Sequence, residues 1–276
     1  MNYADVFILV NTESRMIRGS TLKNVLTLTI EKLGEEPYAC ILCYPRPSRA
    51  ELRKRLKELQ GLHVEALEFG GVKQAFGISV LGKGCVGIVT IAYRNGEKAA
   101  LKIRRVDADR SRMQQEAKML KKANSVHVGP RLLGVSKNFL LMQFIDGDLL
   151  PKWVEKHRGK TQIRKVLHEV LEQCWRLDIV GLDHGELSHA PKHIIIDKKS
   201  KPFIVDFETA SLNRKSSNVT SICQFLFISG VVAEKVAEKL GGKDKKAIIE
   251  ALRRYKTDRT RENFETVLEA CGLQAM

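Results

Sequence analysis

The stretch FGISVLGKGCVGIV, residues 76–89, decides the fold. Its glycines, Gly82, Gly84 and Gly87, lie between two apolar runs, and a dinucleotide-binding unit would need them to open a helix. Here they open a second apolar run, residues 88–93, that ends at the hairpin signal Asn95-Gly96. A third run, residues 99–103, follows directly. The stretch therefore predicts a three-stranded antiparallel meander with a glycine-rich loop.

A lysine in the third run and a glutamate after it extend this pattern. Lys102 lies within Ala-Leu-Lys-Ile, and a charged side chain in an apolar strand needs an anionic partner, either a phosphate or a carboxylate. Ser111 and Gln114 predict the capped start of a helix, whose buried stripe includes Met113 and leaves Glu116 at its edge. Glu116 is therefore the candidate partner of Lys102, and a solvent-facing helix charge is the alternative.

Two further patterns lie in the second half of the chain. Residues 161–177 carry apolar side chains at helical spacing and predict a core helix. Asp206 ends the apolar run that begins at Phe203, where an unpaired carboxylate would be costly. A magnesium ion that bridges phosphates would neutralise Asp206, and a structural ion pair is the alternative.

These patterns belong to a set of motifs that occur in protein-kinase order across residues 76–211. The set is Gly82-x-Gly84-x-x-Gly87-x-Val89, Lys102, Glu116, Leu141-Met-Gln-Phe-Ile-Asp-Gly147, His184-Gly-Glu-Leu187 and Ile204-Val-Asp-Phe-Glu208. In this order the chain resembles an atypical protein kinase of the RIO and KEOPS-associated type, and the archaeal predicted serine/threonine kinase family. Each motif is common by itself, whereas their joint order is specific.

The resemblance implies an α+β, two-lobed, protein-kinase-like fold. Residues 71–147 would form an antiparallel-sheet N-lobe with the hinge, and residues 148–276 a mainly helical C-lobe with a basic helical tail. Residues 1–70 are expected to form a small α/β domain in front of it, of βαβα order. Its predicted elements are a strand at 6–10, a helix at 21–33, a strand at 38–44 and a helix that starts after the cap Ser48 and ends at Gly61.

The resemblance also implies an ATP site with a divalent metal, Mg²⁺ or Mn²⁺. The loop residues would lie over the phosphates, Lys102 held by Glu116 would bind the α- and β-phosphates, and adenine would pack against the hinge at 142–146. The nucleotide-binding residues expected are Gly82, Lys83, Gly84, Gly87, Val89, Lys102, Glu116, Met142 and Phe144. The catalytic residues expected are Glu186, Lys102 and Asp206, and the metal ligands Asp206, His193 and Glu208.

The catalytic loop departs from the usual H-R-D-x-x-x-x-N pattern. Gly185 replaces the arginine and Glu186 the aspartate, which removes a docking point for a phosphorylated activation loop but keeps a carboxylate. Because phosphoryl transfer depends more on positioning than on strong base catalysis, we expect Glu186 to serve as the catalytic carboxylate. Asp183 is the reserve candidate.

The position of the metal-binding asparagine holds Pro191, which offers no side-chain ligand. His193 directly precedes the expected strand 194–197, which suggests two extra residues in the loop and makes His193 the candidate ligand. Imidazole is a poor ligand for magnesium and a fair one for manganese. Two alternatives remain: Lys192 contacts the γ-phosphate as a point charge, or His189 and His193 are loop surface.

The whole composition bounds partners and location. With 47 Lys and Arg against 32 Asp and Glu, the chain carries a net charge of +15, which favours polyanionic partners such as nucleotide, RNA or an acidic protein face. A plain solubility role is the alternative. Cys40 and Cys43 lie three apart on an expected strand, which argues against a zinc site. No apolar run is long enough to span a bilayer, and residues 6–10 lack a preceding basic segment, so we expect no membrane contact and a cytoplasmic protein.

The sequence thus predicts an ATP-dependent phosphotransferase, an atypical serine/threonine protein kinase that acts on a protein hydroxyl, its own included. Only about a dozen residues follow Asp206 before the next apolar run, with no A-P-E motif, so the usual peptide shelf has no room. Substrate recognition would fall to residues 1–70 and to the basic tail. Two alternatives remain: an ATPase or pseudokinase switch subunit of an RNA-handling complex, and a small-molecule kinase.

Overall fold

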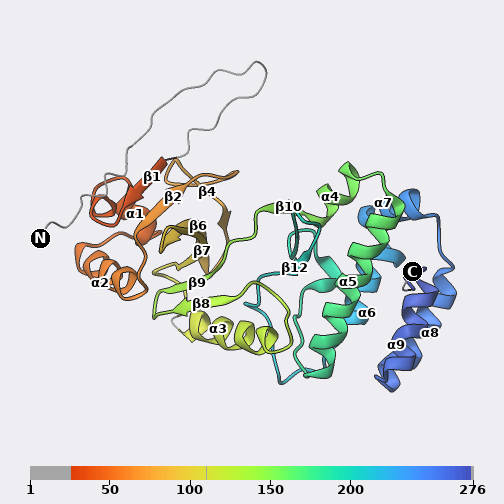
Figure 1. The fold of residues 1–276 in the computed structure, drawn as a ribbon. Helices are drawn as coiled ribbons and strands as arrows, with labels where there is room; N and C mark the ends of the chain where they lie inside the picture. The colour runs from red at the N-terminus through yellow and green to blue at the C-terminus, as the bar shows by residue number, and fades with distance from the viewer. Residues whose placement is uncertain (1–25, 110, 275–276) are drawn as a thin grey trace, which may run out of the picture.

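The computed structural model describes residues 26–109 and 111–274. Figure 1 shows a lobe built on a β-sheet at one side and a helical lobe at the other. Residues 144–146 connect the last strand of the first lobe, β9 (Phe139–Gln143), with the first strand of the second, β10 (Gly147–Leu149). The two-lobed α+β architecture is the one that the motif order implies.

Within these residues, a seven-stranded antiparallel sheet forms the centre of the N-lobe. Its path is β1-β2-β6-β7-β9-β8, and β5 pairs with β6 off this path. The glycines open a strand, as predicted, and Asn95 and Gly96 both have positive φ, 51° and 72°, as the hairpin between β6 and β7 requires. The strands besides β9 are β1 (Leu26–Thr29), β2 (Ala66–Phe69), β5 (Gly82–Lys83), β6 (Gly87–Arg94), β7 (Glu97–Arg104) and β8 (Leu132–Val135).

Short elements complete the N-lobe around this sheet. Its main core joins the sheet to the elements before β2 through Leu33, Ile41 and Leu59, whereas Met113 and Ala117 of α3 form a separate cluster with Leu140 of β9. The elements are η1 (Lys32–Gly34), α1 (Tyr38–Leu42), α2 (Arg49–Gly61), the hairpin β3 (Lys73–Ala75) and β4 (Ile78–Val80), and α3 (Ser111–Asn124).

Two secondary-structure predictions for the first 70 residues are wrong. The expected helix 21–33 is, from residue 26 onward, strand β1 and the 3-10 turn η1, because Leu26 pairs with Phe69 of β2. The expected strand 38–44 is helix α1 with the turn after it. Short apolar runs do not distinguish strand from helix, and tertiary pairing decided both cases. The expected strand 6–10 lies outside the described residues.

The predicted helix after Ser48 is confirmed. Helix α2 begins after Ser48, whose hydroxyl accepts the N–H of Glu51 at 3.2 Å, and it ends at Gly61. Cys40 and Cys43 now lie on a helical turn, but Cys43 is buried and the Cys40 thiol donates to Glu36. Strand β2 pairs with β6, so the sheet runs on across the expected domain boundary at residues 70–71.

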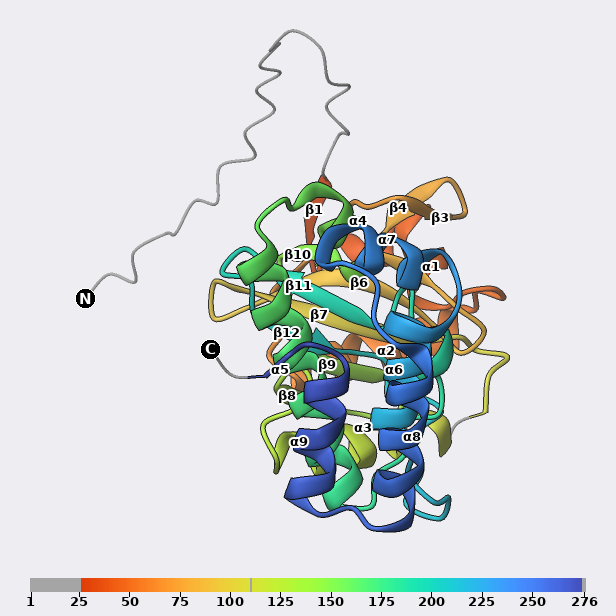
Figure 2. The same cartoon turned by 90° about the vertical axis from the view of Figure 1, so that its right-hand side faces the viewer.

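The C-lobe surrounds helix α5 (Lys160–Ile179), which confirms the predicted core helix. Its buried stripe packs against α6 and α7 and the small sheet β10-β11-β12. Figures 1 and 2 place α8 and α9 side by side, at the end of the molecule away from the N-lobe sheet. The remaining elements are α4 (Leu150–Lys156), η2 (Leu187–His189), β11 (Ile194–Asp197), β12 (Pro202–Ile204), α6 (Asn218–Cys223), the π-helix η3 (Gln224–Ile228), α7 (Val231–Leu240), α8 (Lys245–Thr257) and α9 (Arg261–Ala270).

Among the described helices, no single one combines the length and apolar character needed to cross a bilayer, and one sharply bent pair, 218–228 with 231–240, meets the criterion by length and composition.

Candidate active site

Lys102 and Glu116 form a buried ion pair in the N-lobe. Strand β7 places Lys102 between Val89 of β6 and Leu140 of β9, and its Nζ lies 2.7 Å from the Glu116 carboxylate on α3. Both side chains are less than a tenth exposed. Burial by itself would lower the pKa of Lys102, but the carboxylates around it, Glu116 foremost, raise that pKa above its ordinary value. The lysine therefore remains charged.

Two carboxylates of the C-lobe also reach the same ammonium. Asp206 lies 3.3 Å and Glu208 2.9 Å from the Lys102 Nζ. Because an ammonium has three N–H donors, the three acidic partners found among the described residues engage all of them. The segment after β12 thus meets the N-lobe at Lys102, and Asp206 does so with a left-handed backbone, φ 68°.

Arg112 is a residue that the sequence reasoning missed. Its guanidinium lies 3.8 Å from the second carboxylate oxygen of Glu208. Arg112 precedes Glu116 by four residues on α3, so both side chains lie on the same helix face. That spacing was the available signal, because a basic residue one turn before the lysine's partner faces the same site.

The glycine-rich loop passes close to Lys102. A Cβ on Gly87 would lie 2.8 Å from the carbonyl oxygen of Ile103 and 3.2 Å from the Lys102 side chain, so this position needs glycine for close packing. The turn is closed by the Gly84 N–H, which donates to the Gly87 carbonyl. Lys83 is exposed at the turn, with its ammonium 4.9 Å from the ring centre of Tyr44.

The candidate adenine contacts lie where the lobes join. Met142 belongs to β9, opposite Ala100 of β7, and is half-buried. Phe144 lies in the segment that leads to β10 and is also half-buried. Met142 therefore lies on the strand next to that of Lys102, and Phe144 lies in the segment that joins the lobes.

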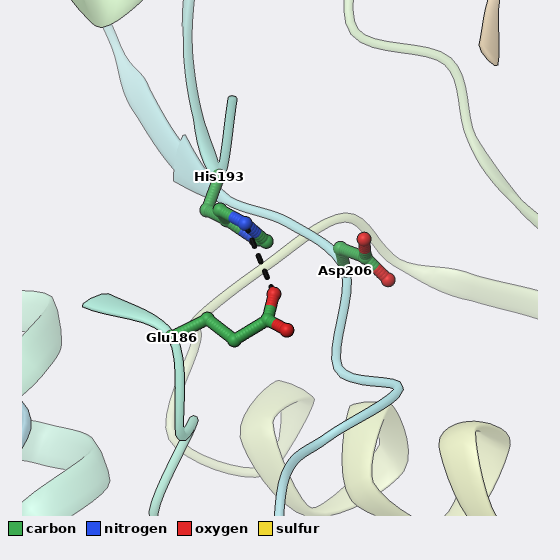
Figure 3. Close-up of side chains that lie close together, drawn as sticks. All are labelled: Glu186, His193 and Asp206. Carbon is green, nitrogen blue, oxygen red and sulfur yellow. Dashed lines mark ion pairs between the residues drawn. The ribbon is translucent and has the colours of Figure 1, made fainter. Parts of the chain in front are cut away.

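Glu186, His193 and Asp206 come together from three segments of the C-lobe (Figure 3). The His193 Nε2 lies 3.0 Å from a Glu186 carboxylate oxygen, and one ligand-type atom of each of the three residues lies within 4.8 Å of the others. His193 is buried, whereas 40% of the Glu186 side chain is exposed. These carboxylate and imidazole donors fit a divalent cation. A second such group, Glu116, Asp206 and Glu208, surrounds Lys102.

The loop that carries Glu186 is held by its neighbours. His184 is buried, its Nε2 lies 3.0 Å from the Val205 carbonyl, and burial lowers the pKa of His184 to about 4. Gly185 has φ 91°, and a Cβ there would lie 2.5 Å from the Arg214 guanidinium and 3.1 Å from Thr209. The left-handed backbone and the close approach of Thr209 therefore favour glycine at the position where arginine is usual.

Asp183, the reserve candidate, has a different set of partners. Its carboxylate accepts from the Arg214 Nε at 2.8 Å and from the Ser217 N–H at 3.3 Å, and its backbone forms an isolated bridge with Ser211. Asp183 therefore ties down the short segment after Asp206.

A family model matches the part of the chain that contains this site, and a curated protein matches part of the chain. A model of the RIO domain matches residues 90–219. An uncharacterized protein of Methanocaldococcus jannaschii is 33% identical over 117 residues, which span 42% of this chain and 98% of that protein. The matched domain contains Lys102 and Glu116 from the N-lobe as well as Asp206 from the C-lobe. Since the match covers both lobes where they meet around this lysine, the chain belongs to the RIO family of atypical kinases.

Proposed function

We propose that this protein is an ATP-dependent phosphotransferase, an atypical serine/threonine kinase whose acceptor is a protein hydroxyl, its own included. The observation that carries this proposal is the charged Lys102, which buried Glu116 holds at 2.7 Å and which faces Asp206 of the other lobe. A fixed ammonium opposite a metal-binding carboxylate is the arrangement that phosphoryl transfer requires.

In this proposal the N-lobe binds the nucleotide. Lys102 contacts the phosphates, and adenine packs beside the hinge against Met142 and Phe144. Because Gly87 packs directly on β7, the loop lies near enough to Lys102 to cover the same phosphates. The covering residues are Gly82, Lys83, Gly84, Gly87 and Val89.

The C-lobe supplies the metal ligands and the acceptor side. Asp206, His193 and Glu208 are the proposed ligands of Mg²⁺ or Mn²⁺, which would neutralise phosphate charge during transfer. Glu186 orients the acceptor hydroxyl, because its carboxylate is partly exposed and its contact with His193 fixes it in place. Positioning of this kind is the main task of a protein in phosphoryl transfer.

Incubation with γ-labelled ATP tests the proposal. The pure protein is given Mg²⁺ or Mn²⁺, and label is followed into protein and into free phosphate, with Asp206→Ala as the blank. We expect label on serine or threonine, which Lys102→Met abolishes. Lys98→Met, on the same strand but paired with Glu68, should retain it. Equal labelling in wild type and in Lys102→Met would refute the assignment of the site.

A second candidate is an ATPase switch within an RNA-handling complex. Pro191 stands where a metal-binding asparagine is usual. The segment after Asp206 is also short, and the ion pair between Asp183 and Arg214 holds it against the C-lobe. The first feature removes a usual metal ligand, the second leaves little room for a peptide acceptor, and the +15 charge favours a polyanionic partner. In the same assay, free phosphate without labelled protein would support this candidate, and label on an added metabolite would support a small-molecule kinase.

A further inference from the structure

We propose that Glu186, His193 and Asp206 form a metal site that prefers Mn²⁺ to Mg²⁺. The inference deepens the proposed function and rests on it in taking Asp206 as the metal residue of the ATP site. It also gives Glu186 a second task, since a carboxylate has two oxygens and can bind a cation with one while the other faces the acceptor.

The three side chains lie close together at the ends of three C-lobe segments, and Asp206 also contacts the Lys102 ammonium at 3.3 Å. Glu186 precedes η2, His193 precedes β11 and Asp206 follows β12, and Figure 3 shows the His193 ring directed at the Glu186 carboxylate with Asp206 beside both. Their ligand-type atoms lie within 4.8 Å of one another. A cation bound at the His193 Nε2 would exchange the 3.0 Å contact with Glu186 for coordinate bonds to both residues.

The backbone and its surroundings hold the imidazole in this direction. The His193 carbonyl accepts the Val205 N–H at 2.9 Å, which ties it to the segment that carries Asp206. The ring meets His184 edge to face, with centroids 5.5 Å apart, and its side chain is 2% exposed. Its Nδ1 has no hydrogen-bond partner among the described residues, and the contact of its Nε2 with Glu186 helps to direct the ring.

The neighbouring acidic group holds Lys102, so Glu208 would have to leave the ammonium before it could join Asp206 as a metal ligand. Glu116, Asp206 and Glu208 surround the ammonium of Lys102 at 2.7, 3.3 and 2.9 Å, so a cation already balances their charge. Asp206 belongs to both groups. A metal on the His193 side would therefore lie next to Lys102, where the phosphates of ATP are expected, without displacing the lysine from Glu116.

The donor set decides the preference. Mg²⁺ favours oxygen ligands and a nearly ideal octahedron, whereas imidazole nitrogen suits transition metals. Replacing the usual amide oxygen by His193 therefore shifts the site toward Mn²⁺, while the two carboxylates keep it suited to a hard divalent ion.

Binding of Mn²⁺ without nucleotide tests the inference. Free Mn²⁺ is measured by electron paramagnetic resonance during titration of the full chain, and Mg²⁺ is then added as competitor. Loss of even an outer-shell partner of a metal ligand costs about 10–100-fold in affinity, so we expect His193→Asn to weaken Mn²⁺ binding at least about tenfold and to narrow the Mn²⁺-to-Mg²⁺ preference. His189→Asn, the same change at an exposed histidine of the same loop, should bind as wild type does.

Glu186→Gln is the second variant, because Glu186 is partly exposed and its substitution leaves the core intact; circular dichroism verifies the fold of each variant. It should also weaken Mn²⁺ binding. Unchanged Mn²⁺ affinity in both His193→Asn and Glu186→Gln would overturn the inference. ATP binding, measured separately by calorimetry, distinguishes the two proposals. If the wild type binds ATP but the variants keep the metal preference of the wild type, the metal site is wrong. If the variants change metal binding as expected but the wild type does not bind ATP, the proposed function is wrong.

Discussion

Lys102 shares its ammonium among carboxylates that differ in how freely they can leave. Glu116 is buried, and Asp206 and Glu208 are both proposed metal ligands, but Glu208 also has Arg112 nearby as a second cationic partner, 3.8 Å away. Phosphate must replace one of these partners to reach the lysine. Glu208 is therefore the carboxylate that competes with the nucleotide.

We expect Glu208→Gln to bind ATP more tightly when no divalent metal is present. Removing the charge weakens the contact that phosphate must displace, and a gain of about tenfold corresponds to ~1.4 kcal/mol. Calorimetry in the presence of a chelator measures it. Glu97→Gln, at the exposed end of the β6–β7 hairpin, is the control, and equal affinities in both variants would contradict the competition.

A pH dependence follows from Glu51 and Arg55 on α2. Arg55 is fully buried and its Nε lies 3.0 Å from Glu51. Burial opposes ionisation of Glu51, but the bond to Arg55 outweighs it and lowers the pKa of Glu51. A lowered carboxyl pKa stabilises the folded protein at pH values above the pKa of the unfolded glutamate, about 4.3. This stabilisation is lost as the pH falls through the pKa of the folded state.

The stability cost of Glu51→Gln should therefore be largest near neutral pH and shrink as the pH drops below about 4. Urea unfolding of both proteins at several pH values measures the difference in free energy of unfolding. A cost that stays constant down to the acid limit would show that the ion pair does not contribute to it.

At the scale of elements, the loop between α5 and η2 depends on Gly185. The position combines a left-handed backbone with crowding by Arg214 and Thr209. Its shape sets the direction of Glu186, the next residue, and so connects backbone conformation to the site.

Gly185→Ala should destabilise the protein more than Gly181→Ala. Both glycines have positive φ, 91° and 68°, but among the described residues no atom lies within 4 Å of a Cβ at Gly181. The cost of placing alanine in a left-handed backbone, about 1–3 kcal/mol, is common to both variants. The difference between their losses of stability therefore measures the effect of crowding at Gly185. Thermal unfolding measures it, and equal melting temperatures would mean that the loop adjusts freely.

At the scale of the whole molecule, a buried carboxylate on α5 connects three helices of the C-lobe. Asp178 accepts from the Asn218 N–H at 2.9 Å, the Val219 N–H at 3.1 Å and the Tyr255 hydroxyl at 3.0 Å. The N-terminus of α6 and the last turn of α8 are thereby fixed to the core helix. Burial raises the pKa of Asp178, and these donors oppose the rise.

Asp178→Ala should cost about 3 kcal/mol or more, because each buried donor left without a partner costs ~1–3 kcal/mol. Tyr255→Phe removes one hydrogen bond of the same network and should cost only about 1 kcal/mol. Chemical unfolding of the two variants measures both values. A cost for Asp178→Ala no larger than that for Tyr255→Phe would show that α6 does not depend on this carboxylate.

Much of the site was predictable because short sequence patterns, such as hairpin signals and apolar spacing, position its residues. The hairpin signal Asn95-Gly96 fixed the meander, and the register of β7 then brought Lys102 into reach of Glu116. The capped start predicted at Ser111 and Gln114 was wrong, since Asp109 accepts the Ser111 N–H and Gln114 donates to the Ser136 carbonyl instead. The helix itself still lies where its apolar spacing indicated.

The sequence by itself determined the antiparallel meander, the core helix α5 and the placement of Asp206 after a buried strand, and it offered Glu116 as the candidate partner of Lys102. Periodicity and turn chemistry act over a few residues, so one chain is enough to read them. Tertiary structure decided that residues 26–29 form a strand, which depends on β2 some forty positions later. It also decided that Glu186 faces His193 while Asp183 binds Arg214, because those contacts depend on how the loop packs between α5, β11 and α6.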